Sequence, residues 1–436
     1  MQTGHWVNRS NKLSFVAKGM TSSKLHQRIL LVSYRWCPQG GVGTRRWSKF
    51  AKYLSRQGVT TEVVCADYPF RDRVNWCADV SGNDRIVRYP TPAGYPDYLR
   101  QPRRGILVKI GSRVLQRTTH PIDTAQGWGR HFVRQCRQRL DSGTPFDAVI
   151  LTVPSFSALM PFAELAADYP GVRFIVDYRD PWTYFFPDYG RTESPERERY
   201  TALEGEALSR VDEVWFTTEE HRRDYSRRFP ESDLKFRVLP NGYDPEDFPD
   251  ATRLRRGNMI AVCPGTLIRE RMETLANLLR GLVQVDDPVL NQHFRIHLYT
   301  NERPALDDYE PGVREAYARF VRLHDVVSPP AMARILAESR FGLVLHDANY
   351  TQTVPIKLYD FLAAGCEVIY LGPPTEVSRL LEEKGHFCAT DAVDTMVPLL
   401  HRLAARHPRT AAPANEFPQY AIPELTERLL LLLTRQ

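Results

Sequence analysis

The stretch that decides the fold runs from residue 351 to residue 372 and reads Thr-Gln-Thr-Val-Pro-Ile-Lys-Leu-Tyr-Asp-Phe-Leu-Ala-Ala-Gly-Cys-Glu-Val-Ile-Tyr-Leu-Gly. Pro355 suits the first turn of a helix, where its missing N–H costs no hydrogen bond. Gly365 suits the position just after a helix. An apolar run follows at once and predicts a strand. The stretch therefore predicts a loop, a helix and a strand in direct succession.

The start of this helix has the features of an anion site. The loop before Pro355, which includes Thr353 and Val354, directs free backbone N–H groups and the positive end of a helix at whatever lies in front of it. Lys357 adds a cation within the first turn. Asp360 lies further along, where its carboxylate can accept hydrogen bonds from a sugar diol. An anion at the helix tip and a diol at the acid are what a nucleoside diphosphate requires.

The stretch also resembles the donor-binding helix of the family-four glycosyltransferases, enzymes in which two Rossmann-like domains face a cleft. The resemblance is carried by Val-Pro-x-Lys-Leu-Tyr-Asp-Phe-Leu-Ala-Ala-Gly at residues 354–365. It implies that Asp360, where the family usually has Glu, holds the nucleotide ribose. It also implies that Gln352, at the place of another Glu, contacts the donor sugar. Asp keeps the charge on a shorter arm, whereas Gln keeps hydrogen bonding and loses the charge.

Length and composition narrow the class of protein. A chain of 436 residues is too long for one ordinary core and predicts two or three domains. Its apolar content of 42% and charged content of 25% are typical of a globular soluble protein. No apolar run reaches the roughly 18 residues of a membrane-spanning helix. The first 25 residues lack the apolar centre of a signal peptide.

The cysteine pattern predicts a reduced, cytoplasmic protein. The cysteines are scattered, odd in number and never at Cys-x-x-Cys spacing, so no structural zinc is expected. The seven are Cys37, Cys65, Cys77, Cys136, Cys263, Cys366 and Cys388.

Positive charge is concentrated in one segment. The net charge is only +6, yet from Arg100 to Arg139 ten Lys or Arg residues stand against one acid, Asp123, and apolar residues alternate with them. Two interpretations stay open: a basic helix peripheral to an anionic membrane surface, or a solvated helix face packed on its own sheet. Nucleic acid is not expected as a partner, because the segment carries no recognised motif and the rest of the chain is not basic.

Short apolar strands alternate with helical patterns along the chain, which predicts an α/β fold with parallel sheets covered on both faces. Strands are expected at residues 28–33, 61–66, 85–89, 148–152, 173–177, 213–217, 236–239, 259–263, 294–299, 341–346 and 367–371. Helices are expected at residues 45–57, 155–168, 195–210, 219–228, 272–282, 330–338, 355–364, 375–384 and 423–433.

The same alternation predicts the domain organisation. We expect a weakly packed basic segment (residues 1–27), an acceptor domain (28–250), a linker around residues 245–257, and a donor-binding domain (258–410). Both domains are Rossmann-like. The resemblance implies that the last helix, within residues 411–436, packs back on the first domain.

Glycines follow the strand predicted at residues 28–33. Gly40, Gly41 and Gly43 precede a helix, where glycines let the backbone approach a ligand closely. Thr44 and Arg45 start the following helix and are near enough to reach the same ligand. The spacing is not a strict dinucleotide fingerprint, and a simple connecting turn is the alternative. The loop also resembles the glycine loop that opens the acceptor side of the cleft in the same glycosyltransferase family.

A second polar set follows the strand predicted at residues 173–177. Asp177, Arg179, Asp180 and Trp182 stand where open α/β sheets bind ligands. The segment resembles the Asp-Phe-Arg-Asp-Pro-Trp sequence of bacterial family-four enzymes. Asp180 is the candidate for touching the acceptor hydroxyl, and Arg179 is a second catalytic candidate. For Asp177 a buried ion pair with Arg179 is an equal alternative, and Trp182 is either a wall or a stacking platform for a sugar.

A third set follows the first strand of the second domain. Gly265, Thr266, Arg269 and Arg271 resemble the family's Gly-Thr…Arg segment, which implies that basic side chains hold the donor pyrophosphate. Such charge-assisted hydrogen bonds contribute about 1.5–3 kcal/mol each. Arg271 is the preferred candidate and Arg269 the alternate. The competing interpretation is two solvated arginines at a helix start, where a cation is electrostatically disfavoured.

The resemblance spans roughly residues 28–384 and implies the glycosyltransferase B fold. It implies transfer of a sugar from a nucleotide-diphosphate sugar to a glycan, lipid-linked or small-molecule acceptor, with retention of anomeric configuration, in bacterial surface polysaccharide or glycoconjugate synthesis. Arg271, Lys357 and the amides around residues 353–354 would stabilise the departing diphosphate. No metal or other cofactor is therefore expected, and no Asp-x-Asp metal motif stands in a suitable loop.

Two alternatives remain open. A sugar-nucleotide epimerase on the same fold would require strong acids near the donor sugar, and Gln352 argues against it. A catalytically silent relative that binds a nucleotide sugar or a partner protein is compatible with the same replacement.

Overall fold

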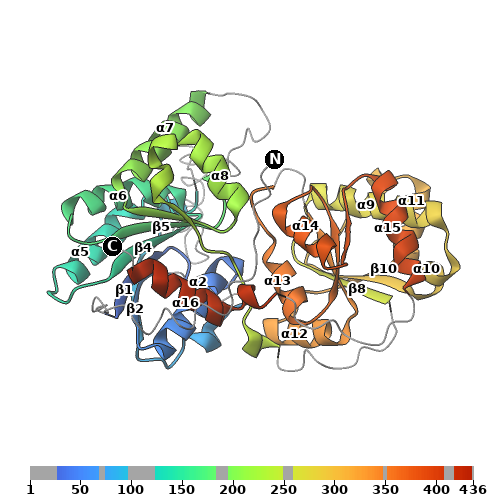
Figure 1. Ribbon diagram of the computed structural model, residues 1–436, viewed down its shortest axis with the longest axis horizontal. Helices are drawn as coiled ribbons and strands as arrows, with labels where there is room; N and C mark the ends of the chain where they lie inside the picture. Colours follow the sequence, from blue (N-terminus) through green and yellow to red (C-terminus); the bar gives the residue numbers. More distant parts are fainter. Residues whose placement is uncertain are drawn as a thin grey trace, which may run out of the picture.

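The computed structural model describes residues 27–67, 74–96, 123–182, 195–248, 259–346, 351–406 and 417–434. These residues form two lobes, each a parallel sheet flanked by helices (Figure 1). The predicted fold class, two Rossmann-like domains, is confirmed. Residues 1–26 of the predicted segment 1–27, most of the predicted linker and residues 100–122 of the basic segment lie outside the described residues.

The first lobe holds a seven-stranded parallel sheet in the order β3-β2-β1-β4-β5-β6-β7. Its strands are β1 (Arg28–Ser33), β2 (Thr60–Asp67), β3 (Ile86–Pro92), β4 (Ala148–Val153), β5 (Phe174–Tyr178), β6 (Glu213–Phe216) and β7 (Phe236–Val238). Its helices are α2 (Val42–Arg56), α5 (Gly129–Leu140), α6 (Leu159–Asp168), α7 (Pro195–Arg210) and α8 (Glu219–Arg228). Because the strands pair in parallel, the loops that follow β1, β4, β5 and β6 lie at one edge of the sheet.

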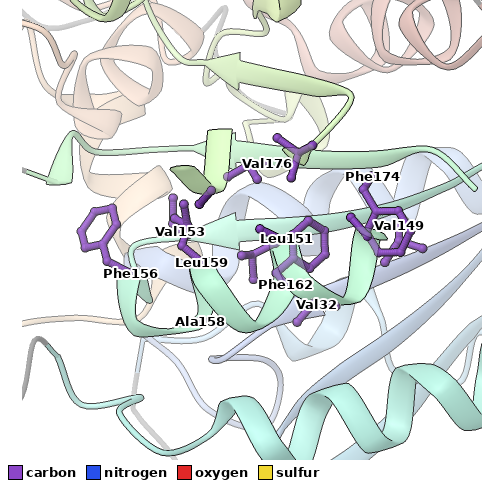
Figure 2. Close-up of a cluster of buried hydrophobic side chains, with 14 of the residues drawn as sticks. Val32, Val149, Leu151, Val153, Phe156, Ala158, Leu159, Phe162, Phe174 and Val176 are labelled. Carbon is purple, nitrogen blue, oxygen red and sulfur yellow. The ribbon is translucent and has the colours of Figure 1, made fainter. Parts of the chain in front are cut away.

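The core of this lobe lies between the sheet and α6 (Figure 2). Leu151 of β4 and Val176 of β5 are buried together with Phe162 of α6. Burial of a side chain of this size contributes about 1.5–3 kcal/mol. This packing fixes the strands whose ends carry the predicted acceptor-side residues.

The second lobe holds a six-stranded parallel sheet in the order β10-β9-β8-β11-β12-β13. Its strands are β8 (Met259–Pro264), β9 (Phe294–Tyr299), β10 (Val321–His324), β11 (Phe341–Leu345), β12 (Glu367–Leu371) and β13 (Phe387–Ala389). Its helices are α9 (Arg269–Val285), α10 (Pro288–His293), α11 (Pro311–Phe320), α12 (Pro329–Glu338), α13 (Ile356–Ala363), α14 (Glu376–Glu383) and α15 (Val393–Ala405). Its outermost strands, β10 and β13, have four and three residues, and the sequence did not predict them.

The last helix, α16 (Ile422–Thr434), returns to the first lobe (Figure 1). Leu425 and Leu429 are buried in the same apolar cluster as Phe50 of α2. Arg173 donates from Nη1 to the carbonyl oxygen of Leu432 at 2.9 Å. The chain therefore crosses between the lobes twice, which couples their positions. Within the described ranges, none of the helices combines the length and the hydrophobicity that crossing a membrane requires.

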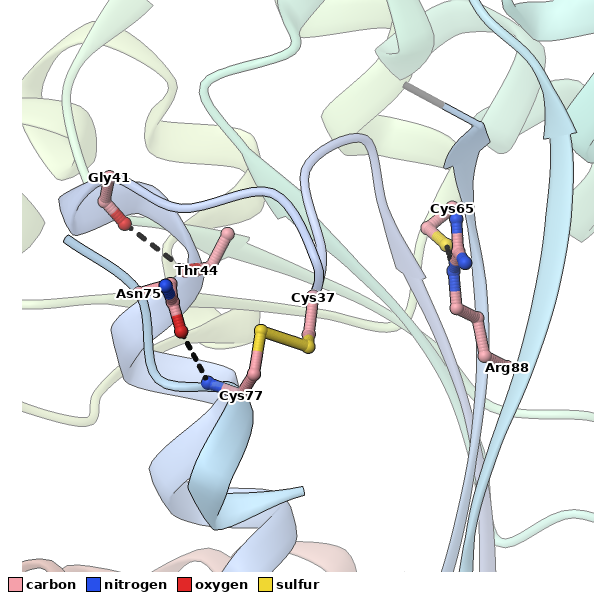
Figure 3. The surroundings of a disulfide bond; sticks show 7 residues. All are labelled: Cys37, Gly41, Thr44, Cys65, Asn75, Cys77 and Arg88. Atoms are coloured by element: carbon pink, nitrogen blue, oxygen red, sulfur yellow. Dashed lines mark hydrogen bonds between the residues drawn. A yellow bond between two sulfur atoms is a disulfide. The ribbon is translucent and has the colours of Figure 1, made fainter. Parts of the chain in front are cut away.

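Cys37 and Cys77 form a disulfide (Figure 3), which corrects the prediction that the cysteines are reduced. Their Cα atoms are 5.4 Å apart, a spacing that a disulfide spans. Cys37 follows β1 and Cys77 begins a 3-10 turn (Cys77–Asp79), so the fold joins two loops that lie 40 residues apart in the sequence. Sequence spacing alone could not indicate this pair. The free cysteines are Cys65, Cys136, Cys263, Cys366 and Cys388.

Candidate active site

Helix α13 begins at Ile356, with Pro355 at its N-cap, one residue later than predicted. Gly365 ends the helix with φ +69°, and the Cys366 N–H donates to the carbonyl of Phe361 at 2.8 Å. The helix lies close to β11, because a Cβ on Gly342 would come within 2.2 Å of the Phe361 ring. This packing sets the height of the helix N-terminus above the sheet.

Two cations meet at the end of β8. Nζ of Lys357 lies 3.3 Å from the carbonyl oxygen of Pro264 and 3.5 Å from Sγ of Cys263. Arg271 donates from Nη1 to the carbonyl of Thr266 at 2.8 Å, while its Nε is buried without a partner. Burial lowers the pKa of Lys357; the Cys263 thiol partly opposes this and the Arg271 charge adds to it. Among the described residues neither cation pairs with a carboxylate, so an anion at this loop would satisfy both.

The rest of this loop is open to solvent. Gly265 has φ +113° and is exposed together with Thr266, and Arg269 is exposed at the start of α9. The carboxylate of Glu302 accepts from the Leu267 N–H beside them. The placement favours Arg271 over Arg269 as the residue that faces the loop.

We call residues 351–355, which precede α13, the donor loop. In this loop Gln352 and Thr353 are partly exposed and Val354 is buried. The side-chain Oε1 of Gln352 is buried and has no hydrogen-bond partner. A buried acceptor without a donor is costly in an unliganded protein, and a sugar hydroxyl would supply that donor. The carbonyl of Gln352 accepts from Oγ1 of Thr218, in the other lobe, at 2.5 Å.

The glycine loop follows β1 and starts α2. Gly41 is the helix N-cap with φ +83°, and Oγ1 of Thr44 donates to its carbonyl at 3.1 Å (Figure 3). The carbonyl of Gly43 accepts from Nη1 of Arg179, and a Cβ on Gly43 would lie 3.1 Å from that atom. Gly40 is buried beside them. The loop is therefore held from the end of β5.

Arg179 and Asp180 lie side by side at this edge of the sheet. Arg179 also donates from Nε to the carbonyl of Val153 at 3.0 Å, so it ties together the loops after β1, β4 and β5. Burial lowers its pKa, and the charges of Asp180 and Asp177 oppose the shift. Burial raises the pKa of Asp180, and Arg179 partly opposes this. Asp180 is partly exposed and is the carboxylate at this edge that could take a proton.

The predicted acceptor-side role of Asp177 needs correction. Its side chain is fully buried and its oxygens accept from Arg46 (2.9 and 3.1 Å), from Nε1 of Trp47 (2.8 Å) and from Oγ1 of Thr152 (3.0 Å). It cannot meet an acceptor, since these donors enclose it. The alternative of a buried ion pair describes it better, although the partner is Arg46 and not Arg179.

Trp182 is also turned away from the cleft. It is 2% exposed and stacks on Phe156, with ring centroids 5.3 Å apart and planes inclined by 4°. Of the two predicted roles for Trp182, this placement fits a side chain that forms part of the wall, and it does not fit a platform on which a sugar stacks.

The sequence did not indicate Thr217, which contacts Arg179 within the first lobe, or two contacts that join the lobes, those of Thr218 and of Arg45. Oγ1 of Thr217 donates to the carbonyl of Arg179 at 3.4 Å, and Thr218 caps α8 while it contacts Gln352. Arg45 of α2 forms an ion pair with Asp360. A Thr-Thr pair directly after β6 was the available indication for the threonines. The ion pair could not be predicted, because Arg45 and Asp360 lie 315 positions apart in the sequence.

Three carboxylates, those of Asp79, Asp244 and Asp247, are close enough together to hold a metal ion. Nζ of Lys49 lies among them, at 2.6–2.9 Å from an oxygen of each. The ammonium group takes the place that a cation would occupy, and these ion pairs join α2 to the turn that contains Asp79 and to the segment after β7.

Three solved structures share this architecture. Sucrose-phosphate synthase from Thermosynechococcus elongatus has a TM-score of 0.58 at 15% identity and covers 93% of this chain and 95% of its own. HepE from Anabaena in complex with UDP gives 0.55 at 12%, over 93% and 99% of the two chains. The E. coli trehalose-6-phosphate structure bound with UDP-2-fluoro glucose gives 0.56 at 13%, over 94% and 99%. No curated protein sequence matches the chain.

These likenesses show that the chain has the glycosyltransferase B fold. Residues 40–242 match the family model described as the glycosyl transferase 4-like domain. The first lobe is therefore similar to the glycosyl transferase 4-like domain, and the predicted class, a glycosyltransferase, is confirmed.

Proposed function

We propose that the protein transfers a sugar from a nucleoside diphosphate sugar to an acceptor hydroxyl in the cleft between its lobes. The observation that carries this proposal is the pair of cations, Lys357 and Arg271, at a loop where neither has a carboxylate partner among the described residues. The bound UDP and UDP-2-fluoro glucose of two structural neighbours support a nucleotide sugar as the ligand.

The chemistry follows from the positions of these groups. When the bond to the sugar breaks, negative charge develops on the diphosphate, and Lys357, Arg271 and the N–H groups at the start of α13 are already directed toward it. Because these fixed charges balance the leaving group, we infer that no divalent metal is needed. Asp180 would accept the proton of the acceptor hydroxyl. The hydrogen bond from Thr218 to the donor loop joins the two lobes beside this site, where closure of the lobes would exclude water.

The finer assignments rest on the resemblance to family-four enzymes. We infer retention of anomeric configuration and an acceptor that is a glycan, a lipid-linked sugar or a small molecule, in bacterial surface polysaccharide or glycoconjugate synthesis. A catalytically silent sugar-nucleotide binder is the second candidate, because the oxygen of Gln352 can hold a sugar hydroxyl without supplying a charge.

A thermal-shift screen with UDP, GDP, ADP, dTDP and their common sugar conjugates tests the proposal. A ligand present at about 100 times its Kd stabilises the native state by about 2.7 kcal/mol, which raises the melting temperature by several degrees. At least one nucleotide should do so, with or without EDTA. Release of nucleoside diphosphate by the binding donor would separate an enzyme from a silent relative. No shift with any member would contradict the proposal.

We expect Asp360→Asn to weaken binding of that nucleotide about tenfold or more, because a charged acceptor for two ribose hydroxyls is lost. Calorimetry at one temperature measures the change. Asp168→Asn, an exposed acid paired with Arg137 far from the cleft, is the matched control. Equal nucleotide affinity in wild type and Asp360→Asn would show that the acid does not contact the ribose.

We also propose that the basic segment from Arg100 to Arg139 places the protein on the inner face of the cytoplasmic membrane. Its described part includes α5, in which Arg137 pairs with Asp168 and Arg139 pairs with Glu62. Sedimentation with vesicles containing anionic lipid should be strong at low salt and fall as salt rises. If the protein sediments equally with anionic and with neutral vesicles, the membrane proposal is wrong, and the basic segment is a solvated helix face packed on its own sheet.

A further inference from the structure

An ion pair joins the two lobes across the donor site. Nη1 of Arg45 in α2 donates to one oxygen of Asp360 in α13 at 3.1 Å, and Nη2 donates to the other oxygen at 2.5 Å. The Arg45 side chain is 5% exposed and that of Asp360 is 26% exposed. Under the proposed function Asp360 is the acid that accepts the ribose hydroxyls. A guanidinium fixed on that acid therefore bears directly on nucleotide recognition.

Arg45 is held firmly by its own lobe. The next residue, Arg46, donates to Asp177 and to the carbonyl of Leu239, so the start of α2 is tied to the sheet. The guanidinium carbon of Arg45 lies 5.9 Å from the ring centroid of Trp76, within reach of a cation–π contact. The first lobe therefore fixes the start of α2, which carries Arg45, and the guanidinium group has one aromatic contact besides Asp360.

The pair leaves room for a ligand on the acid. A carboxylate has about four acceptor positions, and Arg45 occupies one on each oxygen. One position on each oxygen remains, which matches the two hydroxyls of a ribose. Burial raises the pKa of Asp360 and Arg45 opposes this shift, so the pair favours the ionised acid, which accepts from both hydroxyls. The partial exposure of Asp360 gives those hydroxyls access.

We propose that Arg45 is a positioning residue for ribose recognition: it fixes the Asp360 carboxylate from the opposite lobe, so that the diol is selected only when the lobes are together. The inference rests on the proposed function, since it requires a nucleoside diphosphate on the second lobe. It explains how an aspartate serves at this position, because the shorter side chain is oriented by a bidentate partner.

The test compares ribonucleotides with their 2′-deoxy forms. Kd values for UDP, 2′-deoxy-UDP, GDP and 2′-deoxy-GDP are measured by calorimetry for wild type, Arg45→Met and Arg45→Lys. Wild type should bind the ribose form of at least one base about tenfold more tightly than its 2′-deoxy form. Arg45→Met should reduce this ratio to near one, mainly by weakening the ribose form. Arg45→Lys, which keeps the charge without the fork, should retain part of the discrimination.

Arg56→Met is the matched control. Arg56 lies on the same helix and makes a bidentate pair with Glu246 at 2.5 and 3.0 Å, but both side chains are about half exposed and outside the cleft. Its discrimination ratio should equal that of wild type. Three results would overturn the inference and leave the proposed donor site unaffected. They are an unchanged ratio in Arg45→Met, a wild type that does not discriminate between the ribose and 2′-deoxy forms, and tighter UDP or GDP binding in Arg45→Met. The last result would mean that the nucleotide must break the ion pair in order to bind. Failure of wild type to bind UDP, GDP or any other nucleotide of the thermal-shift panel would overturn both the inference and the proposed function.

Discussion

Replacing Lys357 with Met should lower turnover by about 10²–10³-fold while the protein stays folded. In the unliganded protein Nζ rests on the Pro264 carbonyl and the Cys263 thiol, and burial already lowers the pKa of the ammonium group. Burying the ammonium group without a carboxylate partner costs free energy, and a bound anion offsets that cost. The largest gain comes in the transition state, where the diphosphate carries most charge.

The measurement is the rate of nucleoside diphosphate release from the donor that stabilises the protein most, together with the melting temperature. Lys357→Met should melt no lower than wild type, because an unpaired buried ammonium is replaced by an apolar chain of similar length. Lys235→Met is the control: Nζ of Lys235 also rests on carbonyls, those of Ser209 and Val211, and burial also lowers its pKa, but it lies far from the donor loop in the sequence and in the other lobe. Wild-type turnover in Lys357→Met would remove the lysine from the mechanism.

Local features of the sequence predicted the donor helix well. Pro355 and Gly365 determine where α13 begins and ends by their own backbone restrictions, so the prediction was correct to one residue at its start. All strands except β10 and β13 were found for a similar reason, because buried parallel strands are continuous apolar runs. The loop after β8 and the acidic loop after β5 could be placed at the cleft because ligands bind at the carboxyl ends of such strands.

Contacts between distant residues could not be predicted in this way. Asp177 and Asp180 differ by only three positions, yet Asp177 is enclosed by donors that include Arg46, 131 residues away, whereas Asp180 is partly exposed. The disulfide of Cys37 and Cys77 depends likewise on where two loops meet. In each case a single sequence contains the residue types but not the pairing.

Removal of the Asp177 carboxylate should have the largest effect on stability. Arg46 and Asp177 are 1% and 0% exposed, and Arg46 would be left as a buried charge without its acid in Asp177→Ala. Breaking a buried pair in this way costs about 3–5 kcal/mol, a large part of the roughly 5–15 kcal/mol that stabilises a typical domain. Urea denaturation followed by far-UV circular dichroism measures the change in the free energy of unfolding. Asp168→Ala, in the exposed pair with Arg137, should cost at most about 1 kcal/mol.

A double variant distinguishes the buried charge from the packing. If the loss in Asp177→Ala comes from the unpaired guanidinium of Arg46, then Arg46→Met combined with Asp177→Leu should be more stable than Arg46→Met alone or Asp177→Leu alone, because neither charge remains. Carbonyl oxygens of Leu239 and Pro240 would then lose their donor, so recovery should be partial. If the double variant loses as much free energy of unfolding as the two single variants together, then the two side chains stabilise the protein through packing and not through their charges. Helix α2 carries both Arg45 and Arg46, so a single variant that displaces the helix should also weaken nucleotide binding. If the double variant binds the nucleotide more tightly than the single variants, then the position of α2, and not the buried charge, determines the ion pair between Arg45 and Asp360.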